Sequence, residues 1–563
     1  MSDNIRARTS TLVKKVRLQA ETSAFVVESD GQVRAATATD SSTLDITASH
    51  DMLPVPLDSP QRTFGWLTTC GYWLGEGFGI GQFQIASSYV QAGLSPGAVC
   101  GAILLGNFIV SLGCAANGYV GARFGINLPA YARTAWGIRG TYFVVVCRAV
   151  AAIVWFGTQS YQGGQCTTIM ITAIWPRYKH LPNHLPASAH VTSQGLLSFF
   201  IFWIVQLPLL YLPTYRLRYL FLAKIFIMPA LGLAWFGWAV GRAHGFGSIF
   251  DKGTHIKNGT PVAVVFLQAM TSCISSKSTL ALNLCDTMRY AKSPRLVVVS
   301  CILVLTFLIT LPSILGVIVS SAVEVIYGKS VWSPLQIMPL FGSRAAQFFS
   351  ALCWAWAVVV TNIASNSLAV ANDMMILFPS WVNVRRGQYI TAVLGVVTCP
   401  WTIQATAKTF TSFLSGYTIF LAPLGGILMA DFYLIRRRRI SLPDIFLGRQ
   451  SVYWYSSGVN PRAALAFALG IAPTLPGFCK TINPKLSIPI AATYVSAVVY
   501  PVGVVIGASA YLLLSFVFPP HPLPTDYTAP QYGSSSLAYA GSYASDGKDV
   551  SGEAAEVKAV AEV

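Results

Sequence analysis

The chain of 563 residues is 54% hydrophobic and only 10% charged, and its formal net charge is +17. Because soluble proteins contain roughly 25% charged residues, this composition excludes an ordinary soluble domain and indicates a polytopic membrane protein. The basic residues lie mainly in short loops between apolar segments, which is typical of cytosolic loops and does not indicate a nucleic-acid partner. The 11 cysteines show no metal-ligand spacing, so neither a metal site nor a disulfide framework is predicted.

The hydropathy pattern divides the chain into three regions. Residues 1–60 are polar, lack the apolar core of a signal peptide and are expected to form a disordered cytosolic tail. Residues 61–518 are expected to form the transmembrane core, and residues 519–563 a second disordered cytosolic tail. Trafficking machinery, if it binds, is expected to bind these tails. The core is predicted to be all-α with twelve spans, near residues 64–92, 97–120, 142–172, 193–212, 219–240, 261–284, 296–320, 347–372, 388–405, 409–434, 462–479 and 493–517.

The charges of the loops set the predicted orientation in the lipid bilayer. If the N-terminus is cytosolic, the loops on that side carry more arginine and lysine than the loops on the other side, which is the usual bias. Both termini are therefore expected in the cytosol. The run from Arg436 to Arg439, after the tenth span, is interpreted as a topology determinant or a lipid-facing patch.

Two spans carry residues that loosen a helix. The first has four alternating glycines at 75–81, and the sixth has the hydroxyl-rich stretch 271–279. Backbone groups freed by a break are tolerated in a membrane where they line a cavity. Broken helices at matching positions of two halves indicate inverted repeats. We therefore expect one five-helix repeat over about 64–240, a second over about 261–434, and two extra helices over about 462–517.

Polar side chains inside the third span indicate a ligand site. Trp155 and Gln159 are one helical turn apart and share a face, so a planar ring with amide edges could stack on the indole and bond to the glutamine. The alternative is an indole packed between helices and a glutamine bonded to a neighbouring helix.

Two further spans each contain an ionisable residue, which is costly in a membrane and points to function. Glu76 in the first span is a candidate for proton uptake, and its alternative is a structural pair with a base such as Arg148. Lys277 in the sixth span is a candidate ligand for an anionic or carbonyl-rich group. Its alternative is snorkelling, or pairing with an acid such as Glu76.

Several motifs together resemble the nucleobase–cation symporter-1 family, in particular its fungal uracil, allantoin and thiamine-type permeases. The resemblance covers roughly residues 60–515. The matching stretches are Ala122–Gly140, Trp155–Gly164, Leu280–Lys292, Thr361–Ser367, Leu377–Pro379, Ser457–Ala463 and Leu475–Gly477. The family implies a LeuT-like fold of five plus five helices, with two C-terminal helices added and the substrate bound at the midplane.

The resemblance also implies roles for single residues. Trp155 matches the stacking aromatic of the third span, and Gln159 matches its amide partner. Asn366 matches an asparagine that hydrogen-bonds the substrate, and Thr361 matches a hydroxyl ligand of the family's sodium site. A glutamine of the first span contributes in the family, and the match does not separate Gln82 from Gln84.

Three positions depart from the family pattern. Val360 stands where sodium-coupled relatives carry a second hydroxyl, which favours protons over sodium as the coupling ion. Lys277 lies near the position where an aromatic often covers the substrate, and Cys285 replaces a common proline. No cofactor is expected.

The predicted function is import of a nucleobase or related planar heterocycle, of the uracil, allantoin, purine or cytosine class, by proton symport with alternating access in the plasma membrane. The alternatives are transport of a vitamin-like heterocycle (thiamine, pyridoxine or nicotinamide riboside) and a nutrient sensor with little flux. A membrane enzyme is disfavoured because all seven histidines fall in loops or tails without a metal-ligand cluster.

Overall fold

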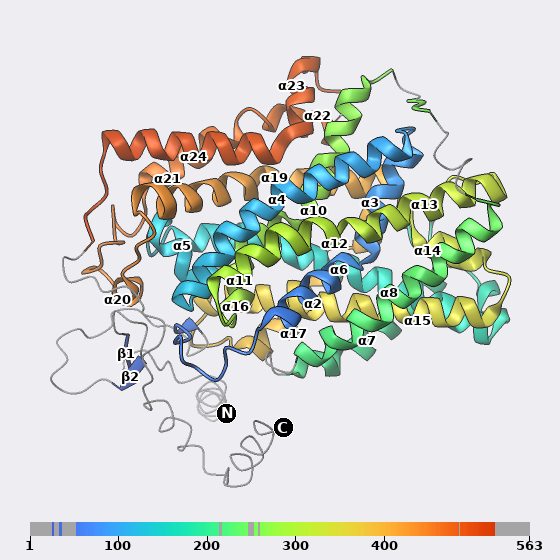
Figure 1. The fold of residues 1–563 in the computed structure, drawn as a ribbon, viewed down its shortest axis with the longest axis horizontal. Coiled ribbons are helices and arrows are strands. Elements are labelled where there is room, and N and C mark those ends of the chain that lie inside the picture. The colour runs from blue at the N-terminus through green and yellow to red at the C-terminus, as the bar shows by residue number, and fades with distance from the viewer. Residues whose placement is uncertain are drawn as a thin grey trace, which may run out of the picture.

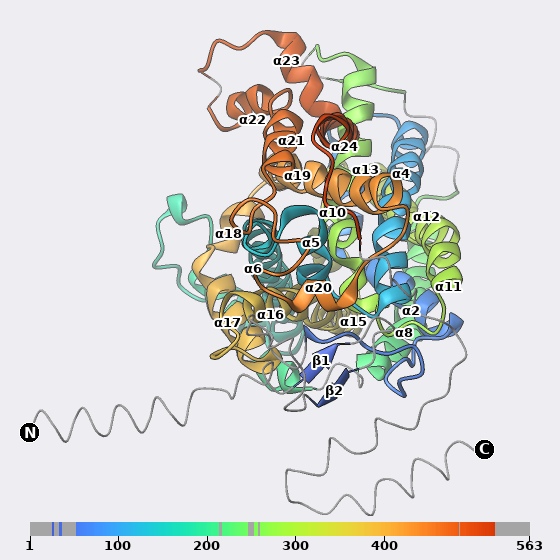
Figure 2. The same ribbon diagram turned by 90° about the vertical axis from the view of Figure 1, so that its left-hand side faces the viewer.

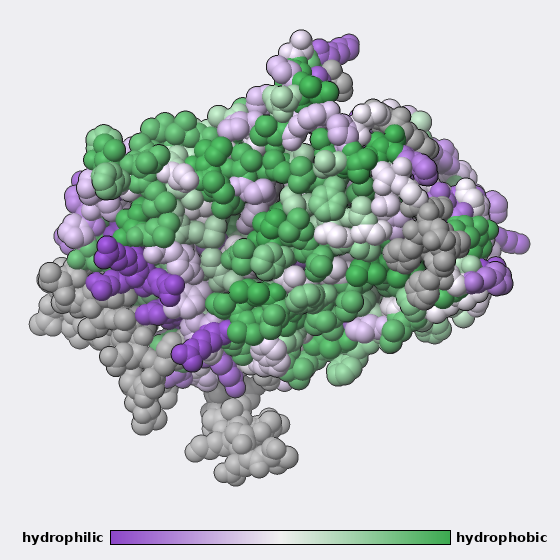
Figure 3. All heavy atoms as spheres, turned by 45° about the horizontal axis from the view of Figure 1, so that its top comes forward, coloured by the Kyte–Doolittle hydropathy of each residue, from purple (hydrophilic) through white to green (hydrophobic). Residues whose placement is uncertain are grey.

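The computed structural model describes residues 25–27, 33–35, 52–212, 217–245, 253–256, 259–483 and 485–523. Long helices run side by side along the longest axis of the molecule (Figure 1). The view turned by 90° shows many of them end-on, with α24 on the flank opposite α17 in both views (Figure 2). Apolar residues cover most of one broad face, and hydrophilic residues gather toward its ends (Figure 3). This distribution is expected of a bundle whose sides face lipid.

The first repeat contains five predicted spans and one further helix. The predicted spans correspond to α2 (Trp66–Gly77) with α3 (Ile80–Gln91), α4 (Pro96–Phe124), α6 (Thr141–Ile174), α7 (Ser193–Gln206) with the 3-10 turn η5 (Leu207–Tyr211), and α8 (Leu217–Arg242). The sequence pattern missed α5 (Leu128–Trp136), which is capped by the Asn127 side chain at the Ala130 amide. Short 3-10 turns, η3 (Pro176–His180) and η4 (Ala187–Ala189), lie between α6 and α7.

The second repeat and the extra helices are given next in the order of the chain. They are α10 (Val262–Met288); α11 (Pro294–Val299), the π turn η7 (Ser300–Leu305), α12 (Thr306–Leu308) and α13 (Thr310–Tyr327); α14 (Pro334–Ile337) and η8 (Met338–Leu340); α15 (Arg344–Thr361), the π turn η9 (Asn362–Ser367) and α16 (Leu368–Leu377); α17 (Val384–Val397) and α18 (Pro400–Ile403); α19 (Ala407–Met429) and the π turn η10 (Ala430–Ile435); α20 (Leu442–Phe446); α21 (Pro461–Ile471) and α22 (Leu475–Ile482); and α23 (Ile490–Val495), η11 (Ser496–Val498) and α24 (Val499–Val517).

The number of spans is only partly established by length and composition. Within the described residues, eight helices are long and apolar enough to cross a membrane, and a ninth span results if α21 and α22, bent by 56°, form one. The helices α10 and α17 and the α2–α3 pair do not meet this criterion of length and hydropathy. The helical membrane core is confirmed, and the number twelve stays a prediction.

The predicted break in the first span is present. Helix α2 ends at Gly77, and α3 begins at Ile80 after the extended residue Gly79, whose φ is −125° and ψ 150°. The carbonyl and amide groups of this break border the central cavity described below.

The sixth span is kinked, but at Asn283 rather than over the predicted residues 271–279. Helix α10 runs from Val262 to Met288, and Asn283 has a non-helical backbone with φ −108° and ψ 15°. Two of the hydroxyls in this stretch bond back to the helix itself. The Ser276 hydroxyl donates to the Cys273 carbonyl at 2.7 Å, and Ser278 donates to the Ser275 carbonyl at 2.9 Å.

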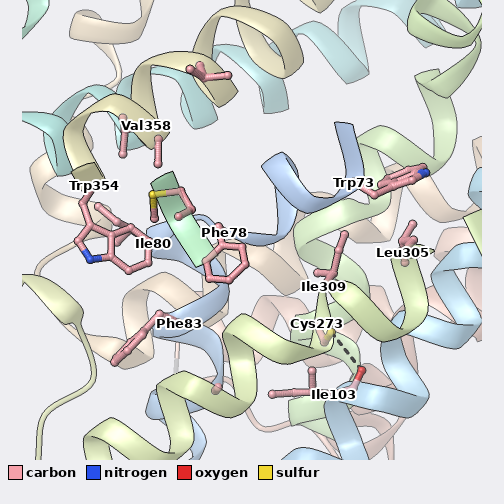
Figure 4. Packing of buried hydrophobic residues seen from close by; sticks show 14 of the residues in the cluster. Trp73, Phe78, Ile80, Phe83, Ile103, Cys273, Leu305, Ile309, Trp354 and Val358 are labelled. Atoms are coloured by element: carbon pink, nitrogen blue, oxygen red, sulfur yellow. Dashed lines mark hydrogen bonds between the residues drawn. The ribbon is translucent and has the colours of Figure 1, made fainter. Parts of the chain in front are cut away.

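Helices α4 and α10 pack so closely at Gly106 and Gly121 that no larger residue fits at either position. A Cβ atom on Gly121 would lie 2.5 Å from the Cys285 Cα atom, and one on Gly106 would lie 2.7 Å from the Met270 carbonyl oxygen. In the same interface the Cys273 thiol lies 3.5 Å from the Ile103 carbonyl oxygen (Figure 4). Small residues that let backbones approach are typical of helix pairs in membranes. We call this contact the α4–α10 seam.

The folded part begins earlier than predicted. Met52, Leu53 and Val55 fall in the predicted N-terminal tail yet are buried. The Arg62 guanidinium donates to the carbonyls of Val55 and Ala122 at 2.9 and 2.6 Å, which fastens this segment to the end of α4. The strands β1 (Phe25–Val27) and β2 (Val33–Ala35) also fall in that tail and pair antiparallel. The rest of the predicted N-terminal tail, and the C-terminal tail beyond residue 523, lie outside the described residues.

Candidate substrate site

A cavity lies where the α2–α3 break meets α6, α10 and the junction of α15 with η9. Its free volume is about 50 Å³, which is smaller than the roughly 300–1,000 Å³ of small-molecule sites. Seven of the eight residues predicted for substrate or cation border this one cavity. The lining residues are Glu76, Gly79, Ile80, Gly81, Gln82, Trp155, Gln159, Gln162, Ser276, Lys277, Thr279, Leu280, Val358, Thr361, Ser365 and Asn366.

Trp155 on α6 is held in place by contacts on α19. Its indole Nε1 donates to the Tyr417 hydroxyl at 3.1 Å, and that hydroxyl donates to the Ser275 carbonyl of α10. The rings of Phe410 and Phe413 meet the indole edge to face, with centroids 6.2 and 5.8 Å away. These contacts orient an aromatic surface at the cavity wall, where a planar ring can stack.

Gln159, one turn from Trp155, offers an amide edge to the same cavity. Its Oε1 atom is buried and forms no hydrogen bond within the described part of the chain. A buried amide oxygen without a donor is costly, and a ligand N–H would satisfy it. The alternative, a glutamine already bonded to a neighbouring helix, therefore receives no support at Oε1.

Asn366 reaches the cavity because the helix is widened at that point. It lies in the π turn η9, and such turns are frequent at functional sites. Its Nδ2 donates to Asn362 Oδ1 at 2.9 Å, and Asn362 in turn donates to the Ser160 hydroxyl of α6 at 3.0 Å. The amide nitrogen of Asn366 is thus fixed by protein. No local sequence pattern indicated the π turn itself.

The structure separates the two glutamines of the first span. Gln82 lines the cavity, and its Oε1 accepts from Lys277 Nζ at 2.8 Å while its Nε2 donates to the Ser276 hydroxyl at 3.1 Å. Gln84, two residues on, does not line the cavity but bonds a residue that does. Its Nε2 donates to the Ser333 hydroxyl at 3.0 Å and to Gln404 Oε1 at 2.9 Å, and its Oε1 accepts from Nε2 of the lining residue Gln162 at 2.9 Å. Gln84 is therefore not part of the cavity.

Lys277 is buried, with 2% of its surface exposed, and it lies beside Gln82 rather than snorkelling to the membrane surface. Its ammonium is hydrogen-bonded to the Gln82 amide oxygen and lies 3.1 Å from the Ser276 hydroxyl. The three side chains together link α3 to α10 at the cavity wall.

Glu76 faces the cavity and is paired differently from the expected alternative. Its Oε1 accepts from the Ser365 hydroxyl of η9 at 2.6 Å. The expected structural pair with Arg148 is wrong, because Arg148 forms a fully buried ion pair with Asp373 of α16.

The sequence analysis missed Lys224 of α8. It is 1% exposed, and its Nζ donates to the Thr361 hydroxyl at 2.6 Å and to the Ala357 carbonyl at 3.1 Å. An ionisable residue inside a predicted span, here 219–240, was the signal that would have found it. Val360, beside Thr361, is buried and supplies no oxygen. Within the described residues no group of three or more His, Cys, Asp or Glu side chains could hold a metal ion.

A helical membrane core with a broken first span and a polar cavity between two sets of helices is the architecture of a secondary transporter. The sequence model for the family described as permease for cytosine/purines, uracil, thiamine, allantoin matches residues 54–503. The chain therefore belongs to this permease family, and it is an integral membrane transport protein rather than an enzyme.

Two relatives and one solved structure show the extent of the likeness. The uracil permease of Saccharomyces cerevisiae is 32% identical over 82% of this chain and 75% of its own length. The allantoin permease of the same yeast is 30% identical over 85% of this chain and 78% of its own length. The closed structure of Mhp1, a nucleobase-cation-symport-1 family transporter with bromovinylhydantoin bound, matches with a TM-score of 0.65 at 21% identity, over 84% of this chain and 97% of Mhp1. The predicted five-plus-five fold is thereby confirmed.

Proposed function

We propose that the protein is a secondary active symporter that imports a planar, amide-containing heterocycle of the uracil or allantoin class, coupled to protons. The unsatisfied Gln159 amide oxygen beside the Trp155 indole is the single observation that carries the substrate class. Together they offer one stacking surface and one acceptor, which a flat ring with N–H groups at its edge would satisfy.

The names of the relatives support this substrate class. The uracil permease and the allantoin permease of yeast, each at least 30% identical to this chain, are named for small heterocycles with amide edges. Gln82 of α3 and Lys277 of α10 add a polar edge, where a ring carbonyl would accept from the ammonium. Purines and cytosine are further members of the same chemical class.

The coupling ion is proposed from the surroundings of Thr361. Sodium requires several oxygen ligands, and the family's sodium site uses the hydroxyl at this position. Here the Lys224 ammonium donates to the Thr361 hydroxyl and to the Ala357 carbonyl. A cation supplied by the chain itself uses the oxygens that a sodium ion would need, so the residues present do not fit sodium. Glu76 and Lys224 remain as groups that can exchange a proton next to the cavity.

The test is uptake of labelled uracil and allantoin in cells that lack their own permeases. We expect uptake that rises at acid pH, is unchanged when potassium replaces sodium and is abolished by a protonophore. Lys224→Met should remove the acid stimulation while the protein still reaches the membrane. Uptake that requires sodium in the wild-type protein would overturn the proposed coupling without affecting the substrate class.

One alternative substrate has a specific observation in its favour. The nicotinamide riboside transporter of Saccharomyces cerevisiae is 28% identical over 76% of this chain. A vitamin-like heterocycle such as nicotinamide riboside, thiamine or pyridoxine therefore belongs in the uptake panel. Saturable uptake of any of these compounds would exclude the other alternative, a sensor with little flux.

Location and orientation complete the proposal. We place both termini in the cytosol and the protein in the plasma membrane. The support is the arginine content of the ends of α4 and α19, at Arg123 and Arg436 to Arg439. Protease accessibility of tags at either terminus, in sealed cells and after permeabilisation, tests the orientation.

A further inference from the structure

A basic and aromatic cluster lies far from the cavity, where α4 ends and η10 follows α19. It consists of Tyr119 and Arg123 of α4, Tyr433 of η10, and Arg438 in the turn after it. The Tyr433 hydroxyl donates to the Ala116 carbonyl at 2.8 Å, which joins the two helix ends. The two tyrosine rings have centroids 6.4 Å apart. We call these four side chains the Arg–Tyr cluster.

Each arginine of the cluster lies over a tyrosine ring. The Arg123 Cζ atom is 6.0 Å from the Tyr119 centroid, and its Nη1 donates to the Tyr119 hydroxyl at 2.8 Å. The Arg438 Cζ atom is 5.5 Å from the Tyr433 centroid. Stacking on a ring leaves the edge of the Arg438 guanidinium free for an oxyanion, whereas at Arg123 the Nη1 atom already donates to Tyr119.

The cluster carries two positive charges that no carboxylate balances. Neither Arg123 nor Arg438 forms an ion pair within the described residues, and the Nε atom of Arg123 is buried without an acceptor. The nearby acid, Asp431, is engaged inside the protein. It accepts from the Tyr511 hydroxyl at 2.9 Å and lies 3.6 Å from the Arg436 Nε atom. An anionic ligand at this surface would therefore meet two guanidinium groups that have no carboxylate partner within the described residues.

The backbone directs Arg438 toward this surface. Arg437 and Arg438 both adopt left-handed conformations, with φ of 50° and 63°, which is unfavourable for residues other than glycine. The Arg438 amide donates to the Phe432 carbonyl at 2.7 Å, which closes the reversed turn. The helix therefore ends abruptly, and the exposed Arg438 side chain lies over Tyr433.

The surface beside the cluster is apolar and exposed. Phe108 and Leu112 are 44% and 47% exposed and lie on the same face of α4 as Tyr119, at spacings of four and seven residues. Leu434, next to Tyr433, is 60% exposed. An apolar strip that leads to two unbalanced guanidinium groups matches an acyl chain followed by a charged headgroup.

We propose that the Arg–Tyr cluster binds the phosphodiester headgroup of an anionic phospholipid in the cytosolic leaflet. This site rests on the proposed orientation and not on the proposed substrate. Arginine binds phosphate through two parallel hydrogen bonds, and anionic lipids are concentrated in the cytosolic leaflet. The Tyr119 hydroxyl, which accepts from Arg123, keeps its proton for a headgroup oxygen. The acyl chains lie along Phe108 and Leu112.

The test is lipid retention and thermal stability of the purified full-length protein. Native mass spectrometry and melting curves are recorded with phosphatidylserine, phosphatidylinositol or phosphatidylcholine added to detergent. We expect retention of an anionic lipid and a higher melting temperature with it, but not with phosphatidylcholine. Arg123→Gln with Arg438→Gln should weaken binding by roughly tenfold to thirtyfold. Tyr119→Phe, which keeps both charges, should weaken it by less.

The control is Arg385→Gln. Arg385 lies over a single ring, with its Cζ atom 4.2 Å from the Tyr211 centroid, and donates to the Tyr211 hydroxyl at 3.0 Å. The Arg385→Gln substitution thus removes one stacked arginine without touching the Arg–Tyr cluster. Three results would overturn the proposal. The first is equal retention of phosphatidylcholine, and the second is unchanged lipid binding in a double variant that melts like the wild type. The third is equal weakening of lipid binding by Arg385→Gln. Stabilisation by inorganic phosphate alone, equal to that by lipid, would do the same.

Discussion

Replacing Trp155 tests the substrate site most directly. In Trp155→Ala the cavity loses its aromatic wall, and in Trp155→Phe it keeps a ring but loses the hydrogen bond from Nε1 to the Tyr417 hydroxyl. Stacking of a heterocyclic base on an aromatic side chain is worth roughly 1–3 kcal/mol, which is about 5-fold to 150-fold in apparent affinity. One neutral hydrogen bond contributes about 1 kcal/mol net, or roughly fivefold.

We therefore expect the KM for the transported heterocycle to rise by about 5-fold to 150-fold in Trp155→Ala and by roughly fivefold or less in Trp155→Phe. The assay is initial uptake over a range of concentrations, normalised to the amount of protein at the cell surface. Trp354→Phe is the matched control, because Trp354 is buried at 2% exposure against Trp235 and outside the cavity. Its KM should not change.

The reasoning would be refuted by a Trp155→Ala protein that reaches the surface in normal amount and shows the wild-type KM. Equal increases of KM in Trp155→Ala and Trp354→Phe would also refute it, because the effect would then be one of general packing.

Three further predictions concern coupling and stability. Glu76→Gln keeps a hydrogen-bond acceptor for Ser365 but loses the exchangeable charge. Competition by substrate should persist while acid-stimulated uptake falls at least tenfold. Unchanged acid stimulation would contradict a role of Glu76 in proton coupling. Asp373→Asn leaves the Arg148 charge buried and unpaired, so the free energy of unfolding should drop by about 3–5 kcal/mol, measured as a lower melting temperature that Arg148→Met in the same chain partly restores. Gly121→Leu should abolish surface expression, because even a Cβ atom there lies 2.5 Å from the α10 backbone; normal uptake by this variant would mean that the seam can separate.

The sequence predicted which residues meet at the cavity better than it predicted the helices around them. Trp155, Gln159 and Asn366 lie on two helices far apart in sequence, yet all border one cavity, because the motif match carried information that spacing alone lacked. Gln82 and Gln84 could not be separated from the sequence. Two residues apart on a helix, they point to different faces, and the sequence does not show which face meets the cavity.

Other features depended on tertiary contacts that no local pattern reports. The π turn that brings Asn366 to the cavity has no composition of its own. Lys224 lies five residues inside a predicted span, where a lysine is equally compatible with snorkelling, and only its contact with Thr361 shows that it points inward. The hydroxyls of 271–279 were misinterpreted because a serine that bonds back to its own helix has the same sequence as one that opens it.

The α4–α10 seam also constrains the order in which the helices can pack during biosynthesis. Helix α4 belongs to the first repeat and α10 to the second, so the glycine face of α4 has no partner while the intervening chain is being made. About 140 residues separate the end of α4 from the start of α10, which takes on the order of 10 s at ordinary rates of translation. During this interval the exposed face of α4 must be covered by lipid or by the insertion machinery. The first repeat therefore cannot complete its packing before the second begins to emerge.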